Sequence, residues 1–224
     1  MSSTMPTAFW QVAADRLLDA VAHDPSAPAF VRRPLLRWVT WQQRNQTTVA
    51  QALRTPQLAP AWAANLVVLD AQVADAHAEA QPYAQALKRA RTWAQVAVPL
   101  PLAPHAADWV ARAPTDEPIV YVAAALRLDA AGQVAGLRVA LTGVSPRPVF
   151  VPQGLETFVG RPATPTTWQA IAEAVAAQTR PKDDVRGSAA YRRAMAAVLT
   201  RRALQGAAAA AQRPDVPPTA GGVP

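Results

Sequence analysis

Cysteine is absent from the 224 residues, and glycine is scarce and unevenly placed. Without cysteine there is no disulfide, thiolate metal site, iron–sulfur ligation or cysteine nucleophile. The first ten residues also lack the pattern of a secretory signal peptide. Together with the absence of cysteine, this predicts a cytoplasmic protein. All nine glycines follow residue 131. Because a phosphate-cradling loop needs residues without a Cβ, a glycine-rich dinucleotide loop is excluded from the first 131 residues.

Long apolar runs and clustered metal ligands are missing too. No stretch approaches the roughly 20 apolar residues that span a bilayer, so we expect no membrane partner. The three histidines, His23, His77 and His105, lack metal-ligand spacing, which predicts no metal site. Asp183 and Asp184 are adjacent and would point apart in an extended segment. No catalytic residue is therefore predicted.

The net charge of +7 comes from arginine far more than from lysine. A basic nucleic-acid-binding module is an alternative that rests on this charge alone. At about 100° per residue, Arg192 and Arg201 fall on opposite sides of a helix, which predicts a solvated helix rather than a phosphate-binding face. The distributed charge therefore argues against a nucleic-acid partner.

The first half of the chain has mainly helical patterns. Apolar residues at four-residue spacing predict an amphipathic helix over residues 6–23. Residues 35–53 are mostly helical in pattern, with Leu36, Val39 and Trp41 as the expected core anchors.

The pattern is less decisive further along this half. Residues 62–73 begin as a helix, and their last eight residues, 66–73, fit either a helix or a strand. Residues 74–93 fit a helix or a loop. The three prolines of residues 96–104 predict a linker between two domains.

The second half has clearer boundaries. Residues 119–128 and 134–144 are rich in β-formers and flank a turn with Gly132, which predicts a β-hairpin. Thr164 and Ser188 are N-cap residues of two helices. The apolar stripe expected on the last helix consists of Tyr191, Met195, Val198 and Leu199.

Three motifs of this half resemble a known family. They are residues 114–126 (PTDEPIVYVAAAL), residues 141–148 (LTGVSPRP) and residues 184–204 (DVRGSAAYRRAMAAVLTRRAL). In this order they are similar to the C-terminal domain of the medium, FAD-carrying subunit of molybdenum hydroxylases of the carbon-monoxide and xanthine dehydrogenase type. In the last motif we expect Asp184 to be a structural anion, paired with Arg186 near the capped helix.

A weaker resemblance continues upstream. Residues 44–53 (RNQTTVAQAL) and 69–73 (LDAQV) are similar to a segment of the family's FAD-binding domain. The family's Gly-Gly-Asn stands here as residues 50–52, Ala-Gln-Ala, and an aspartate of the family falls on Ala61. The resemblance leaves three candidate cofactor-binding residues, namely Asn45, Thr47 and Thr48.

The predicted fold class is α+β. Residues 101–205 would form a small antiparallel sheet with helices on one face, like the CO dehydrogenase flavoprotein C-terminal domain. Residues 1–100 would be a mostly helical, degenerate remnant of a PCMH-type FAD-binding domain. Residues 206–224, a run of alanines followed by proline and glycine, would be a disordered tail.

The resemblance implies one of two functions. The first is a non-catalytic, truncated relative of the medium subunit that acts in docking, assembly or oligomerisation and binds no cofactor alone. Its partners would be the large and iron–sulfur subunits of a molybdenum hydroxylase, or a second copy of itself. The second is an FAD-binding electron-transfer subunit whose flavin site is completed by a partner chain.

Overall fold

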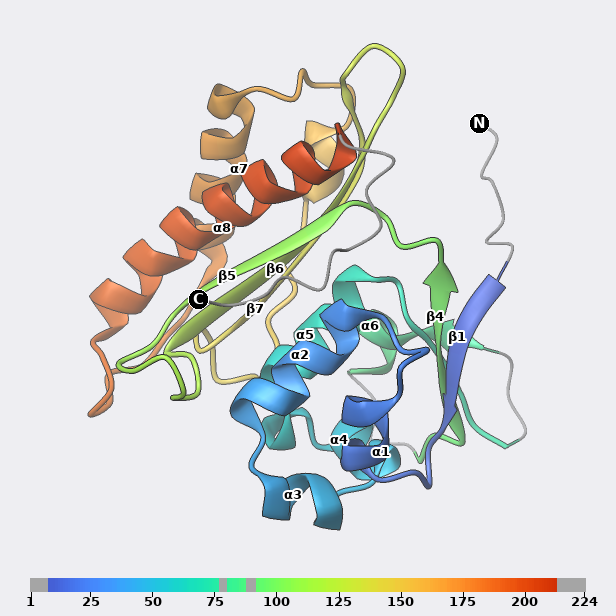
Figure 1. Cartoon of the computed structure of the whole chain (residues 1–224). Helices are drawn as coiled ribbons and strands as arrows, with labels where there is room; N and C mark the ends of the chain where they lie inside the picture. Colours follow the sequence, from blue (N-terminus) through green and yellow to red (C-terminus); the bar gives the residue numbers. More distant parts are fainter. Residues whose placement is uncertain (1–7, 77–79, 88–91, 213–224) are drawn as a thin grey trace.

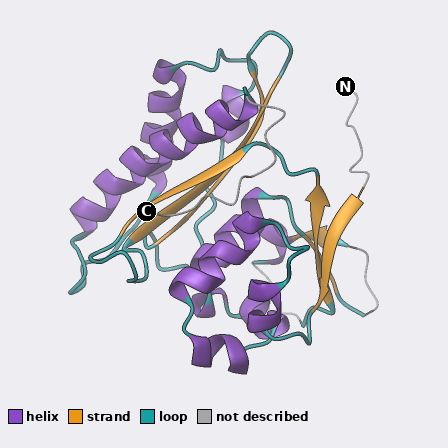
Figure 2. Ribbon diagram, viewed as in Figure 1, coloured by secondary structure: helices purple, strands orange, loops and turns teal. Residues whose placement is uncertain are grey.

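The computed structural model describes residues 8–76, 80–87 and 92–212, and these form two halves packed against each other (Figure 1). The second half is a three-stranded antiparallel sheet in the order β5-β6-β7, with two helices on one face (Figure 2). The predicted α+β class is confirmed. The elements of this half are β5 (His105–Val110), β6 (Val120–Leu128), β7 (Val134–Thr142), η2 (Leu155–Phe158), α7 (Pro165–Gln178) and α8 (Ala189–Ala211).

The central strand β6 is buried on both faces. Val120, Val122 and Ala124 contribute to the core under α7 and α8. Tyr121 and Ala123 contribute to the core of the first half. An alternating strand with two buried faces reads as a continuous apolar run, which is the pattern the sequence shows here. The predicted hairpin is confirmed, and Gly132 has a positive φ of 73° in its turn.

The last helix is longer than predicted. Ser188 caps α8, accepting a hydrogen bond from the backbone N–H of Tyr191, and the helix continues to Ala211. The predicted disorder is therefore wrong for residues 206–211, while residues 213–224 lie outside the described part. A Cβ on Gly206 would lie 2.8 Å from the Cβ of Ala106, so α8 packs closely on β5. Ala207 and Ala208 are buried as a result.

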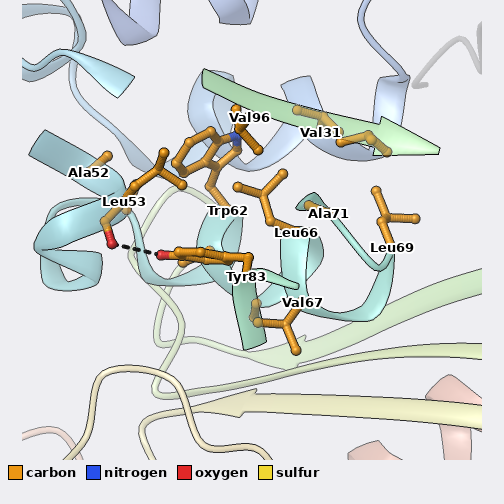
Figure 3. Packing of buried hydrophobic residues seen from close by; sticks show 14 of the residues in the cluster. Val31, Ala52, Leu53, Trp62, Leu66, Val67, Leu69, Ala71, Tyr83 and Val96 are labelled. Carbon is orange, nitrogen blue, oxygen red and sulfur yellow. Dashed lines mark hydrogen bonds between the residues drawn. The ribbon is translucent and has the colours of Figure 1, made fainter. Parts of the chain in front are cut away.

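The first half is a group of short helices beside a second antiparallel sheet, ordered β1-β4-β2-β3. It was expected to be mostly helical, and the sheet is an addition to that prediction. Its core surrounds Trp62 of α5, and the hydroxyl of Tyr83 donates to the Leu53 carbonyl at 3.1 Å (Figure 3). The elements are β1 (Ala8–Ala13), α1 (Leu18–His23), α2 (Ala29–Trp38), α3 (Trp41–Gln46), α4 (Val49–Arg54), η1 (Pro56–Leu58), α5 (Pro60–Val68), β2 (Gln72–Ala74), β3 (Gln81–Pro82), α6 (Tyr83–Ala86) and β4 (Gln95–Leu100).

Two predictions fail at this second sheet. Residues 8–13 form a strand rather than the start of a helix, and residues 95–100 form its partner rather than a linker. Trp10 is buried while Phe9 is 40% exposed. Neighbouring side chains therefore point to opposite faces, as in a strand with its period of two residues. The prolines of the second segment do not prevent pairing, since Pro99 lies opposite Phe9 in the ladder.

The expected anchors of α2 and α3 are also partly wrong. Val39 is buried, but Leu36 is 45% and Trp41 is 70% exposed. The inward residue of α3 is instead Arg44, whose Nη1 donates to the Val39 carbonyl at 2.7 Å and whose Nε donates to Asp19 at 2.9 Å. A buried arginine that satisfies the end of α2 replaces the expected tryptophan.

A buried polar contact joins the two halves. The hydroxyl of Tyr121 on β6 donates to Oδ1 of Asn65 on α5 at 2.6 Å. Nδ2 of Asn65 donates to the Phe30 carbonyl of α2 at 2.6 Å. Burial raises the pKa of the Tyr121 phenol, so the hydroxyl remains a donor. Asn65 therefore fixes the second half to two helices of the first.

The substitution Asn65→Ala should lower the free energy of unfolding by about 2 kcal/mol, because it leaves the Tyr121 hydroxyl and the Phe30 carbonyl without partners. Equilibrium denaturation measures this loss. Tyr121→Phe is the control, since it removes one of the two bonds and should cost less. An Asn65→Ala protein as stable as the unaltered chain would show that the contact does not join the halves.

Candidate functional site

The three motifs of the second half meet at the guanidinium of Arg192. Nη1 donates to the carbonyls of Ile119 at 2.8 Å and Gly143 at 3.0 Å. Nη2 lies 2.7 Å from both carboxylate oxygens of Asp184. Arg192 is 5% exposed, so the motifs build a buried structural contact rather than a solvated helix face. The expectation that charges surround this helix in solvent is wrong at Arg192.

The Asp184 carboxylate has a different partner from the one expected. Its charge is paired with Arg192, whereas Arg186 contributes only its backbone N–H, at 2.8 Å. The guanidinium of Arg186 lies 3.5 Å from the Glu117 carboxylate. The hydrogen bond from Arg192 is the largest cause that holds the pKa of Asp184 below its ordinary value. Asp184 thus stays charged and orders the turn before α8.

Gly143 is the position in these motifs that requires glycine. It has φ of 75°, and a Cβ there would lie 2.0 Å from the Ile119 carbonyl oxygen. That carbonyl and the carbonyl of Gly143 both accept from Arg192. The glycine therefore lets two backbone carbonyls converge on one guanidinium.

Tyr191 lies beside this contact but not in the core. It is 39% exposed, so it does not belong to the apolar stripe of α8, of which Leu199 is buried and Met195 partly buried. Arg192 takes the inward position because α8 reaches the sheet at the carbonyls of the motifs and not at an apolar surface.

In the segment that resembles part of the family's FAD-binding domain, the backbone N–H groups of residues 48–52 all donate to acceptors within the fold. The N–H groups of Val49 and Ala50 donate to the carbonyls of Arg16 at 2.8 Å and Ala14 at 2.7 Å. The N–H of Thr48 donates to the Gln51 side chain, and that of Gln51 to the Thr48 hydroxyl, as a capping box. The N–H of Ala52 donates to the Thr48 carbonyl. Hence residues 48–52 offer no free amide to a phosphate.

The three candidate cofactor-binding residues lie close in sequence but have structural contacts. Nδ2 of Asn45 donates to the Trp41 carbonyl at 2.9 Å. Thr47 is buried, and its carbonyl accepts from the N–H of Leu18 at 2.9 Å. Thr48 caps α4. Together with the occupied amides, these contacts do not fit the phosphates of FAD.

The described histidines have separate environments. His23 lies 3.3 Å from Asp19 on the surface, while Nδ1 of His105 donates to the Ala103 carbonyl at 2.8 Å. Burial lowers the pKa of His105. His77 lies outside the described residues. Within the described part, no three histidine or acidic side chains gather as a metal site, and no helix is long and apolar enough to cross a membrane.

The tryptophans divide between the core and one exposed surface. Trp38 packs edge-on against Trp109 with ring centroids 5.2 Å apart, and Arg37 lies 4.9 Å above the Trp109 ring. Leu36 near the end of α2 and Trp41 at the start of α3 are also exposed. We call Leu36, Arg37 and Trp41 the α2–α3 patch. Aromatic and arginine side chains are typical of protein interfaces.

Residues 105–207 match the family described as CO dehydrogenase flavoprotein C-terminal domain. This stretch of the chain is such a domain. The carbon monoxide dehydrogenase medium chain of Hydrogenophaga pseudoflava is 38% identical over 74 residues, which are 33% of this chain and 26% of that relative. The three predicted motifs are therefore those of the family, and the match spans about a quarter of the curated relative's length.

Solved structures extend the likeness to the fold of both halves. A chain of quinoline 2-oxidoreductase from Pseudomonas putida 86 has a TM-score of 0.73 at 22% identity, covering 91% of this chain and 76% of that one. A chain of carbon monoxide dehydrogenase from H. pseudoflava has a TM-score of 0.74 at 22% identity, with coverage of 90% and 76%. The first half thus shares its fold with these proteins, and the backbone amides of its residues 48–52 are occupied within that fold.

Arg192→Met should destabilise the CO dehydrogenase flavoprotein C-terminal domain by about 3 kcal/mol, since it leaves the Ile119 and Gly143 carbonyls and the Asp184 carboxylate without their donor. Denaturant unfolding followed by tryptophan fluorescence gives the value. Tyr191→Ala is the neighbouring control and should cost about 1 kcal/mol or less, because the ring is half-exposed. Equal losses in the two variants would contradict the role of Arg192.

The contribution of Asp184 should depend on pH. Since its pKa is lower in the folded protein than in the unfolded chain, its stabilisation is complete above the unfolded value and is lost as pH falls through the folded one. Asp184→Asn should therefore be less stable than the unaltered protein at about pH 7, and the difference should shrink below about pH 4. Thermal unfolding of both proteins across this range tests it, and a difference independent of pH would contradict it.

Proposed function

We propose that this chain is a medium-subunit-like component of a molybdenum hydroxylase that acts in docking or assembly and does not bind FAD alone. The observation that carries the proposal is the complete use of the backbone amides of residues 48–52 within the fold. The C-terminal domain beside them keeps its motifs and its buried Arg192 contact. The scaffold is thus intact, while the part that would hold a phosphate is closed.

The α2–α3 patch is the surface we assign to docking. Trp41 is 70% and Leu36 is 45% exposed on consecutive helices, with Arg37 held over the rings of Trp38 and Trp109. A rigid tryptophan beside an arginine is the kind of anchor that dominates binding energy at interfaces. The occupant would be another subunit of the hydroxylase or the same patch of a second copy.

Trp41→Ser should weaken association about tenfold or more, because an exposed aromatic anchor is lost without a change to the core. Sedimentation of the purified chain, and of its complex isolated from the native host, measures the association. Val159→Ser, which alters another exposed apolar residue, is the control. A strict monomer with no co-purifying hydroxylase subunit would contradict the proposal.

The visible absorption spectrum of the same samples decides between docking and electron transfer. We expect no flavin with the isolated chain. Stoichiometric flavin in the chain alone would refute the closed-amide argument. Flavin that is present only in the native complex, and is lost when the chain is separated, would support the alternative in which a partner completes the site.

A further inference from the structure

A cleft lies along the seam between the two halves. It is next to the last residue of β7, at the end of this strand that is farther from the β6–β7 turn. It has a narrow part of about 70 Å³, lined by Trp38 and Val39 among others. A wider part of about 330 Å³ is lined by Arg147, Lys182 and Arg186. Glu117, Pro118 and Thr142 line both parts, which therefore lie next to each other.

The narrow part contains buried polar groups without partners. Thr142 is 5% exposed, and its hydroxyl makes no hydrogen bond within the described part of the chain. Strand alternation directs it to the seam, since Ala140 belongs to the core of the first half and Leu141 to the core under α7 and α8. Buried polar groups are normally satisfied, so this hydroxyl is left for an acceptor that the chain does not supply.

Two indole donors beside the narrow part are out of reach of a ligand. Trp38 and Trp62 both line this part, and the Nε1 atom of each is buried without a partner. Figure 3 shows the nitrogen of the Trp62 ring on the side of Val96, within the core of the first half. Because neither nitrogen is accessible from the cleft, the unpaired group that faces the seam is the Thr142 hydroxyl.

The wide part is lined by basic side chains that are not all neutralised by the carboxylates beside them. Both carboxylates that line it are engaged, Glu117 by Arg186 and Asp184 by Arg192. Arg147 and Lys182 are exposed, and their side chains have no partner among the described residues. Asp183, the next acidic residue in sequence, accepts from the N–H of Ala189 at 2.5 Å. Two cations thus remain free at the mouth of the cleft.

We infer that the seam cleft binds a small organic oxyanion, with its phosphate or carboxylate at Arg147 and Lys182 and a short oxygen-bearing group reaching the Thr142 hydroxyl. The chain offers donors at both ends and no free carboxylate, which selects a ligand rich in acceptors. The narrow part holds less than the roughly 150 Å³ that accommodates a benzene ring, so the inner group is small and not a flavin ring. This inference does not rest on the proposed docking function.

Isothermal titration of the full chain with four compounds tests the inference. Glycerol 3-phosphate and glycerate carry both parts of the proposed ligand, inorganic phosphate carries only the anion, and glycerol carries only the neutral part. We expect saturable binding of glycerol 3-phosphate or glycerate, about tenfold tighter than phosphate, and none of glycerol. Whichever of the two binds more tightly identifies the oxyanion as a phosphate or a carboxylate.

Two variants with a matched control locate the binding. Arg147→Gln/Lys182→Gln should weaken binding of the preferred compound about tenfold or more, since both charge-assisted contacts are lost. Arg16→Gln/Arg54→Gln removes the same charge from exposed positions of the first half and should have no effect. Thr142→Val should weaken the preferred compound but leave phosphate unchanged. If Thr142→Val does not fold, the comparison of Arg147→Gln/Lys182→Gln with its control tests the inference alone, because the residues changed in both are exposed.

Three results would overturn the inference. The first is that neither glycerol 3-phosphate nor glycerate saturates the protein. The second is an equal loss of affinity in the two double variants, which would mean unspecific attraction to net charge. The third is inorganic phosphate binding as tightly as either two-part compound, which would remove the role of Thr142.

Discussion

The second half depends on one buried guanidinium. Arg192 is the only residue of α8, among those described, that joins the start of this helix to the carbonyls before β6 and after β7 and to the turn at Asp184. A buried arginine is tolerated only when all its neighbours are acceptors in the right geometry. That demand explains why Gly143, Asp184 and Arg192 occur together as motifs although they are far apart in sequence. The family pattern is therefore a folding constraint.

The sheet explains why the second half depends on the first. One face is covered by α7 and α8, and the other, with Tyr121, Ala123 and Ala140, belongs to the core of the first half. Without that half the second face would be exposed as an apolar surface, which soluble proteins avoid. The Asn65–Tyr121 contact fixes the covering helices in place. The first half can thus serve the fold without binding any cofactor.

Much of the second half could be predicted from sequence because its local patterns agree with its tertiary contacts. The hairpin at Gly132 and the cap at Ser188 are set by neighbouring residues. The strand at residues 8–13 could not be predicted, since its partner lies at residues 95–100 and four-residue spacing of apolar side chains fits a helix equally well. The buried position of Arg192 could not be predicted, because helical angles show on which side of the helix a charged residue lies but not which groups it meets there. The occupied amides next to the candidate residue Thr48 are visible only in three dimensions, because two of their acceptors are the carbonyls of Ala14 and Arg16.

Residues 50–52, which the resemblance sets against the family's Gly-Gly-Asn, have a coherent structural role. Ala50 and Ala52 favour a helix over the open loop that glycine permits, and Ala52 is fully buried. Gln51 completes a capping box that could not form with glycine at its place. The amides of Gln51 and Ala52 donate to Thr48 in the first turn of α4, and the amide of Ala50 donates to the Ala14 carbonyl. These three residues therefore stabilise the layer that covers the sheet.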